Sequence, residues 1–135
     1  MSAPAELRRR LVGICEALPE VTGEPADRHV VFRVRGRTFA YFQDDHHGDG
    51  RVALVCKVDP GEDEALIGSE PDRYFRSAYS RRGWVSYRLD RPDVAWDLVE
   101  ELVVDSYRRV APKRLARATE DRDTGPDAGT AFTAR

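Results

Sequence analysis

The feature that most constrains the fold is a long amphipathic segment in the last third of the chain. A strand is predicted from Trp84 to Leu89, and Asp90 is placed to cap a helix that runs from about Pro92 to Val110. A helix with one long apolar stripe must bury it against another element, and the preceding strand indicates a sheet. The stripe consists of Val94, Ala95, Leu98, Leu102, Val103, Tyr107 and Val110.

Two residues of this segment invite a functional interpretation. We expect Trp84 to belong to the core with Leu98, Leu102 and Tyr107, so that its replacement by alanine costs about 3–5 kcal/mol. Ser106 has no histidine near it in the sequence, and a helical serine more often packs against, or hydrogen-bonds to, the preceding turn. The sequence therefore predicts structural roles for both.

Residues 30–40 read as a β-hairpin. Apolar and polar residues alternate on both sides of Arg35 and Gly36, which can form a tight two-residue turn. That turn would place Phe32 opposite Phe39, where the two rings would build one wall of the core.

The remaining elements complete a small mixed domain. Before the hairpin, a helix is predicted from Pro4 to Ala17, followed by a linker through Gly23 and Pro25. After it, a third strand is predicted over 51–58. These patterns predict an α+β fold, in which an antiparallel sheet of four to six strands packs against the first and last helices.

Two short helical pieces are predicted between the third strand and Trp84. Asp59 resembles an N-cap, with Pro60 at the first position of a helix that stops at Gly68. Residues 69–75 suggest another turn of helix.

Length and charge set the outer bounds. The chain has 135 residues, so we expect one domain over residues 1–117 and a disordered polar tail over 118–135. The tail carries the whole net charge of −2, and residues 1–117 hold 20 basic and 20 acidic side chains. A neutral domain lacks the basic balance of a dedicated nucleic-acid-binding protein, so only local clustering of cations would favour DNA.

Residues 44–50 contain the densest set of potential metal ligands. Their spacing sketches the start of a calcium loop, but Cys56 stands where the required glutamate would fall. The adjacent His46 and His47 would diverge, and no third zinc ligand has a familiar spacing. We interpret the segment as a solvated hairpin loop and predict no metal and no cofactor; ion binding by this loop is the alternative.

No catalytic motif stands out. The chain has no G-x-S-x-G elbow, phosphate-binding loop or dinucleotide fingerprint, so we expect no enzymatic activity. Cys15 and Cys56 lie among apolar residues and are interpreted as buried, reduced thiols. With no signal peptide and no apolar run of about 20 residues, a cytoplasmic location away from the membrane is predicted.

Arginines are the strongest candidates for binding. Arg33, Arg35 and Arg37 flank the hairpin turn, and Arg81 and Arg82 precede Trp84; these five are the predicted DNA-contacting residues. Further basic residues are Arg73, Arg76, Arg108, Arg109, Lys113, Arg114 and Arg117, and nearby aromatic residues are Tyr74, Tyr79 and Tyr87. The alternative is that the charges form solvated faces and that the tyrosines are core.

Four pieces of the sequence, in this order, resemble the MmcQ/YjbR family of small bacterial proteins. They are Ala17-Leu18-Pro19-Glu20-Val21, the hairpin 30–40, Gly83-Trp84-Val85-Ser86-Tyr87 and Asp105-Ser106-Tyr107-Arg108. The resemblance covers roughly residues 5–115. It implies a compact domain similar to the frataxin (CyaY) fold and a role in DNA binding.

The resemblance leaves rival functions open. The two-winged DNA-binding mode suggested for the family would use arginines at hairpin tips. Arg37 stands at the position where relatives usually carry a basic residue. A protein-interaction module without a nucleic-acid ligand is one alternative, and a frataxin-like metal-binding protein is another. The first helix contains the run Glu6-Leu7-Arg8-Arg9-Arg10, which repels cations, so we expect no specific iron binding. We expect a monomer.

Overall fold

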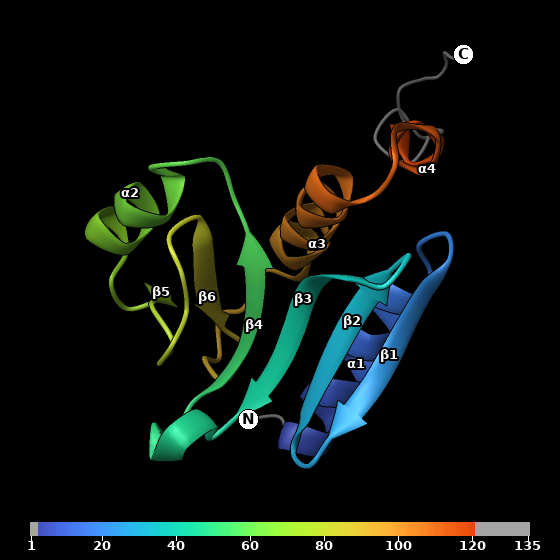
Figure 1. Cartoon of the computed structure of the whole chain (residues 1–135). Helices are drawn as coiled ribbons and strands as arrows, with labels where there is room; N and C mark the ends of the chain where they lie inside the picture. Colours follow the sequence, from blue (N-terminus) through green and yellow to red (C-terminus); the bar gives the residue numbers. More distant parts are fainter. Residues whose placement is uncertain (1–2, 121–135) are drawn as a thin grey trace.

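The computed structural model describes residues 3–120, which form one sheet with the first and third helices packed on one of its faces (Figure 1). All neighbouring strands are antiparallel, and the six strands follow the order β1-β2-β3-β4-β6-β5. The elements are α1 (Pro4–Glu16), β1 (Val21–Ala26), β2 (His29–Val34), β3 (Arg37–Asp44), η1 (His46–Gly48), β4 (Val52–Lys57), α2 (Glu62–Ser69), β5 (Tyr74–Phe75), β6 (Trp84–Arg88), α3 (Trp96–Val110) and α4 (Lys113–Ala118). The predicted α+β fold is confirmed.

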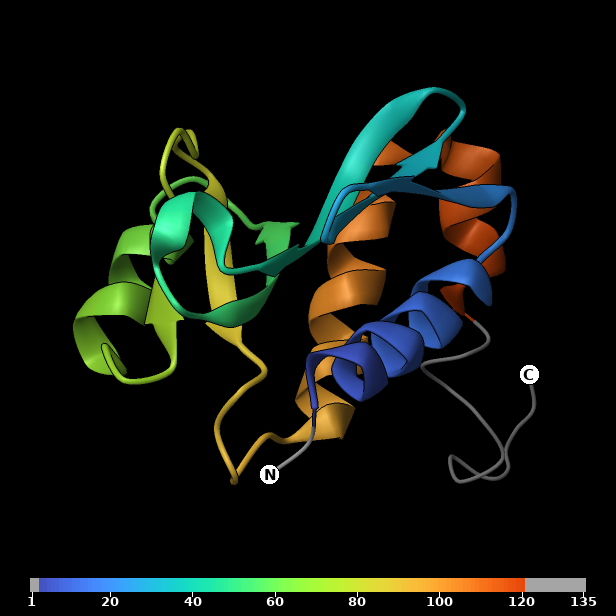
Figure 2. The ribbon, with the colours of Figure 1, turned by 90° about the horizontal axis from the view of Figure 1, so that it is seen from below.

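Helices α1 and α3 cover the same face of the sheet. Figure 2 shows them together on one side of β1, β2 and β3, while the connection from β5 to β6 lies on the other side. Leu11 of α1 and Val99 and Val103 of α3 are buried with Phe32 and Phe42 of the sheet, and each is at most 1% exposed. These two helices do not cover the opposite face of the sheet, which we call the open face.

The hairpin turn was predicted correctly, but the register beyond it was not. Arg35 and Gly36 both have positive φ, 51° and 77°, as a two-residue hairpin turn requires. The ladder then shifts by one residue, so that Phe32 pairs with Ala40 instead of Phe39. The rings of Phe32 and Phe39 are still neighbours in the core, with centroids 6.5 Å apart.

The predicted linker through Gly23 and Pro25 is wrong, because these residues belong to strand β1. An edge strand tolerates proline, whose missing N–H would otherwise break the ladder. Glycine fits because a Cβ at position 23 would lie 3.2 Å from the Phe32 ring and 2.6 Å from the Glu16 carboxylate.

Helix α3 begins at Trp96, later than the predicted start at Pro92. Asp90 does not cap it. Its carboxylate accepts hydrogen bonds from the Arg88 guanidinium, with Nε–Oδ1 and Nη2–Oδ2 distances of 3.0 and 3.1 Å. The observed N-cap is Ala95, five residues after Asp90, and it makes no side-chain capping hydrogen bond.

The region after β4 also departs from its prediction. Helix α2 begins at Glu62, and its N-cap is Gly61 in the left-handed region, φ 90°. Asp59, predicted as the cap, accepts a hydrogen bond from Arg109 at 3.0 Å instead. Residues 74–75, predicted as part of a helical turn, form the short strand β5 beside β6.

Two consecutive residues of α3 fasten the helix to the rest of the fold. The Ser106 hydroxyl donates to the Phe39 carbonyl at 2.5 Å and accepts from the Lys57 N–H at 2.8 Å, so it joins β3 and β4 and does not bond its own helix turn. The Tyr107 hydroxyl donates to the Pro19 carbonyl at 2.7 Å, which fixes the segment between α1 and β1.

The folded part of the chain continues past the predicted domain end at residue 117. Thr119 is buried, and Arg108 donates to its hydroxyl and carbonyl oxygens at 2.6 and 2.7 Å. Most of the predicted tail, residues 121–135, lies outside the described residues.

Replacing Ser106 with alanine should lower the free energy of unfolding by about 2–3 kcal/mol, because one buried and one partly buried backbone group lose their partner. Chemical denaturation monitored by circular dichroism would measure this loss. The matched control is Ser69→Ala, which alters an exposed serine at the end of α2. Equal stability of the two variants would contradict the role of Ser106 as a link between strands.

Candidate functional site

Two of the predicted DNA-contacting arginines are neutralised by neighbouring acids. Arg33 forms an ion pair with Glu24 of the adjacent strand β1. At the hairpin tip, Arg35 binds Glu20, with an Nη2–Oε2 distance of 3.1 Å, and its hydrogen bond lowers the pKa of the Glu20 carboxyl. Phosphate binding by either arginine would have to compete with these carboxylates.

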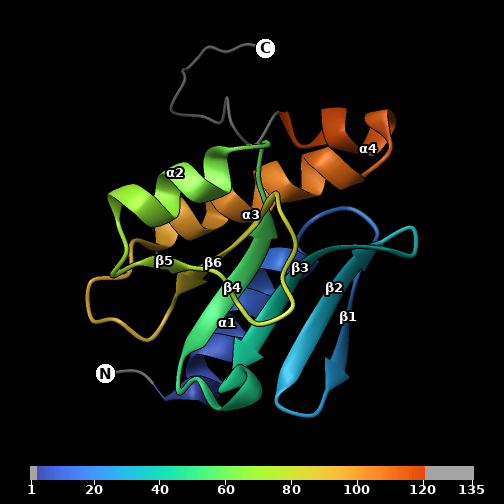
Figure 3. The ribbon, with the colours of Figure 1, turned by 60° about the vertical axis from the view of Figure 1, so that its left-hand side comes forward.

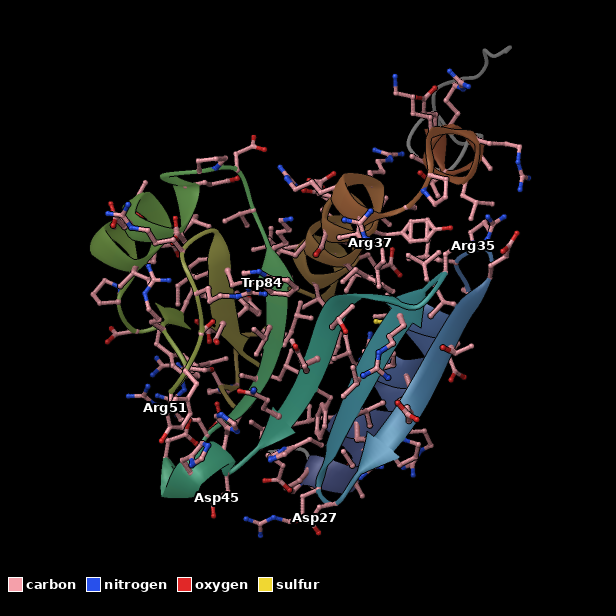
Figure 4. All side chains as sticks on the ribbon, in the orientation of Figure 1. Asp27, Arg35, Arg37, Asp45, Arg51 and Trp84 are labelled. Carbon is pink, nitrogen blue, oxygen red and sulfur yellow. The ribbon has the colours of Figure 1, made fainter. Side chains whose placement is uncertain are left out.

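Arg37 leaves the hairpin toward the opposite face from Arg33. It pairs with Val34, whose side chain is in the core, so its own side chain starts on the helix side of the sheet. Figure 4 shows Arg37 directed toward α3 and Arg35 at the hairpin tip. Arg37 is exposed and has no carboxylate partner in the described part of the chain.

Arg81 and Arg82 lie in the segment 76–83 that connects β5 to β6, and we call this segment the crossing loop. The Arg82 side chain is 92% exposed and lies 4.0 Å from Glu64. Arg81 is exposed and, among residues 3–120, has no carboxylate partner. The structure thus distributes the five predicted arginines over the open face of the hairpin, its helix side and the crossing loop.

Trp84 does not belong to the main core, so that prediction is wrong. Side chains alternate along β6, and Val85 and Tyr87 take the helix-facing positions with no exposed surface. Trp84 therefore points to the open face, where it is half-buried and its ring lies 5.9 Å from that of Tyr41. Leu102 and Tyr107 are buried as predicted, and Leu98 is partly buried.

Trp84 and Tyr41 line a hollow on the open face. The crossing loop passes over β3 and β4 (yellow-green in Figure 3) and leaves a cavity of about 210 Å³ beneath it. We call this cavity the open-face hollow. Its lining includes Tyr41, Gln43, His46, Tyr79, Arg81 and Trp84.

A buried ion pair holds the crossing loop in place. Asp63 is 2% exposed, and its carboxylate accepts hydrogen bonds from Arg76 at 2.8 Å and from the Gly83 N–H at 2.9 Å. Arg76 also donates to the carbonyls of Arg81 and Trp84. The hydrogen bond from Arg76 lowers the pKa of Asp63 to about 2, with help from Gly83, so the carboxyl stays charged.

Two further hydrogen bonds attach the middle of the loop. The hydroxyls of Ser77 and Ser86 lie 2.5 Å apart, and both side chains are buried. On the other side, His46 Nε2 lies 3.3 Å from the Ala78 carbonyl. The His46 ring in turn contacts that of His29, whose pKa is lowered by burial and then by His46.

Gln43 and Tyr79 make the hollow unusual. The Gln43 Oε1 atom is buried and accepts no hydrogen bond from any described residue, whereas buried polar atoms are nearly always paired. Tyr79 is 87% exposed and has φ 65°, which is rare for a bulky residue. Such backbone strain concentrates at binding and catalytic sites.

Two more cations face the same side of the sheet. Lys57 pairs with Trp84 across β4 and β6, so both side chains leave on the open face. Arg51 lies over the Phe75 ring, 4.4 Å from its centroid. In the part of the chain that the structure describes, neither cation has a carboxylate partner. Figure 4 shows Arg51 and Trp84 on the side of the molecule away from Arg35.

Sequence reasoning identified Arg81 but missed the residues beneath the loop. Tyr41 and Gln43 are two apart in β3, so period-two alternation would have placed them on one face. Of the three candidate tyrosines, Tyr74 and Tyr87 are core residues with rings 5.2 Å apart, and only Tyr79 is exposed.

The loop 44–50 uses its acids for its own structure. Asp45 accepts hydrogen bonds from the Gly50 N–H at 2.7 Å and from Arg28 at 2.8 Å, and these contacts lower its pKa. Asp49 accepts from the Arg51 N–H at 2.8 Å. Within residues 3–120, no three histidine, cysteine, aspartate or glutamate side chains converge as a metal site would require.

Both cysteines are buried and free. Burial raises the pKa of the Cys56 thiol to about 12 and also raises that of Cys15, so both stay protonated. None of the described helices has the length and apolar character needed to cross a bilayer.

Comparison with known proteins agrees with this architecture. The model of the YjbR family matches residues 16–109. The chain is also similar to the solved structure of the Deinococcus radiodurans protein DR2400, a DUF419 domain. The two are 27% identical, with a TM-score of 0.65 over 98% of this chain and 100% of that one. A search of curated proteins gave no match.

Replacing Asp63 with asparagine should destabilise the protein by about 2 kcal/mol at neutral pH, as its lowered pKa implies. The Asp63 carboxyl binds a proton less tightly in the folded protein than in the unfolded chain. This contribution is therefore complete above about pH 4 and is lost as pH falls toward about 2. Denaturation of wild type and variant across this pH range would measure it.

The control for this measurement is Glu64→Gln, which changes an exposed neighbour on the same helix. It should shift stability by at most about 0.5 kcal/mol. A difference between wild type and Asp63→Asn that stays constant down to about pH 2 would contradict the ion-pair account.

Proposed function

The chain belongs to the YjbR family, and we propose that it is a cytoplasmic, non-catalytic nucleic-acid-binding protein that uses its open face. The resemblance of its sequence to this family implies DNA binding. The observation that carries this proposal is a set of open-face cations without carboxylate partners on the same face as two accessible aromatic rings. On that face, within residues 3–120, the cations are Arg51, Lys57 and Arg81, and the rings are the half-buried Trp84 and the exposed Tyr79. Two buried free thiols agree with a reducing compartment.

The pairing of charges favours this face over Arg33 and Arg35 of the hairpin, and Arg37 starts on the helix side of the sheet. A cation already bound to a carboxylate gains less from a phosphate, because the first interaction must be broken. Arg33 and Arg35 are in that position, with Glu24 and Glu20. Arg81 needs no such exchange, and its guanidinium can contact a phosphate with two parallel hydrogen bonds.

The aromatic rings favour single-stranded over duplex nucleic acid. Bases in a duplex are stacked on each other, whereas unpaired bases can stack on protein side chains. Trp84 is half-buried and Tyr79 is almost fully exposed, so both have ring surface available for a base. The crossing loop keeps them close to the unpaired cations.

The charge balance implies modest affinity with a small salt dependence. Residues 1–117 carry no net charge, so long-range attraction to DNA is weak. Each phosphate contact on a single strand contributes about −0.7 to the slope of log affinity against log salt, so three contacts imply roughly −2.

The test compares two double variants by fluorescence anisotropy with labelled single-stranded and duplex DNA at about 50 mM salt. Lys57→Gln with Arg81→Gln should reduce the magnitude of the salt slope by about 1.4, because two unpaired cations are lost. The matched control, Arg33→Gln with Arg35→Gln, removes the same charge from acid-paired positions and should change the slope little.

A larger effect of the hairpin variant would move the contact surface to the hairpin and contradict this assignment. If wild type binds neither form of DNA at tens of micromolar, a concentration within the ordinary range of nonspecific binding, the nucleic-acid proposal fails. The chain would then be better described as a protein-interaction module.

A further inference from the structure

We propose that the open-face hollow receives one unpaired nucleobase, which stacks against Trp84 and Tyr41 and donates a hydrogen bond to Gln43. This inference rests on the proposed nucleic-acid function and goes further, because it assigns a base-binding site in addition to a phosphate-binding surface.

The size of the hollow suits a single planar ring system. Its volume of about 210 Å³ is below the ~300 Å³ at which pockets begin to hold drug-sized molecules. A base pair would not fit beneath the crossing loop, whose ends are fixed by Asp63 and Arg76. The loop geometry thus selects for a base that is already unpaired.

The walls provide ring surface. The Trp84 and Tyr41 rings are tilted by 58° to each other, with centroids 5.9 Å apart, and both are outside the main core. Tyr79 also lines the hollow, and its ring centroid lies 4.9 Å from that of His47. Aromatic side chains arranged in this way bind bases of any sequence, because every base has a π-face.

Gln43 supplies the polar contact. Its buried Oε1 lacks a donor in the described chain, and leaving such an acceptor unsatisfied costs free energy. Each nucleobase carries an amino or ring N–H group at its edge that could satisfy this acceptor. A base that enters the hollow would therefore gain a hydrogen bond without displacing one between protein groups.

Arg81 places a cation at the rim of the same hollow. It lines the cavity and has no carboxylate partner among residues 3–120, so it can hold the phosphate attached to the inserted base. Base, sugar and phosphate of one nucleotide would then span Gln43, Trp84 and Arg81.

The test compares an ordinary single strand of about 12 nucleotides, within the usual site size for such proteins, with an abasic strand of equal length and charge. Wild type should bind the base-bearing strand about tenfold more tightly, since stacking is lost in the abasic strand. Equal binding of the two strands would overturn the base site and leave the phosphate surface standing. If neither strand binds, the proposed function fails as well.

Two variants locate the effect. Gln43→Leu and Trp84→Ala should each bring the preference for the base-bearing strand close to one, without changing the salt slope. The double variant Lys57→Gln with Arg81→Gln should weaken binding of both strands equally and reduce the magnitude of the salt slope. Retention of the tenfold preference in both Gln43→Leu and Trp84→Ala would show that the base binds elsewhere.

A spectroscopic measurement needs no change within the hollow. The chain has two tryptophans, and Trp96 lies apart from the hollow with Arg10 over its ring, 4.2 Å from the centroid. In a Trp96→Phe variant, Trp84 is the remaining tryptophan. Its fluorescence should be quenched by the base-bearing strand and unaffected by the abasic one; equal responses to the two strands would overturn the proposal.

Discussion

The Asp63 carboxylate is buried at the start of α2, where Arg76 and Gly83 share it. A buried charge is tolerated only when it is paired and hydrogen-bonded, so the two partners are held firmly. Because Arg76 also donates to the carbonyls of Arg81 and Trp84, this one interaction fixes both ends of the crossing loop. The hollow, its aromatic walls and the unpaired cation at its rim all depend on that anchor.

The need for such an anchor follows from the one-sided packing of the sheet. Helices α1 and α3 bury one face, and the open face of β3 and β4 must be covered in another way. Ala53 and Val55 are buried there although they do not belong to the main core. The crossing loop provides the cover with a hydrogen bond between Ser77 and Ser86.

Periodicity predicted the elements that bury a regular stripe, namely α1, α3 and the meander β2–β3–β4. It missed β1, because Gly23 and Pro25 argue against a strand unless the strand lies at an edge. It misplaced Trp84, because apolar character does not specify the face on which a side chain lies. Arg81 could be proposed from the basic residues that cluster before Trp84 in the sequence. Gln43 could not, because its importance comes from burial under a loop distant in sequence.

Binding of nucleic acid to the open face can be mapped by NMR. Amide and indole shifts of the isotope-labelled protein are followed while unlabelled single-stranded DNA is added. We predict that the largest changes cluster at Gln43, at residues 78–82 and at the Trp84 indole, with little change at the hairpin tip around Arg35. Changes concentrated at Arg35 and Arg37, with the Trp84 indole unmoved, would contradict it.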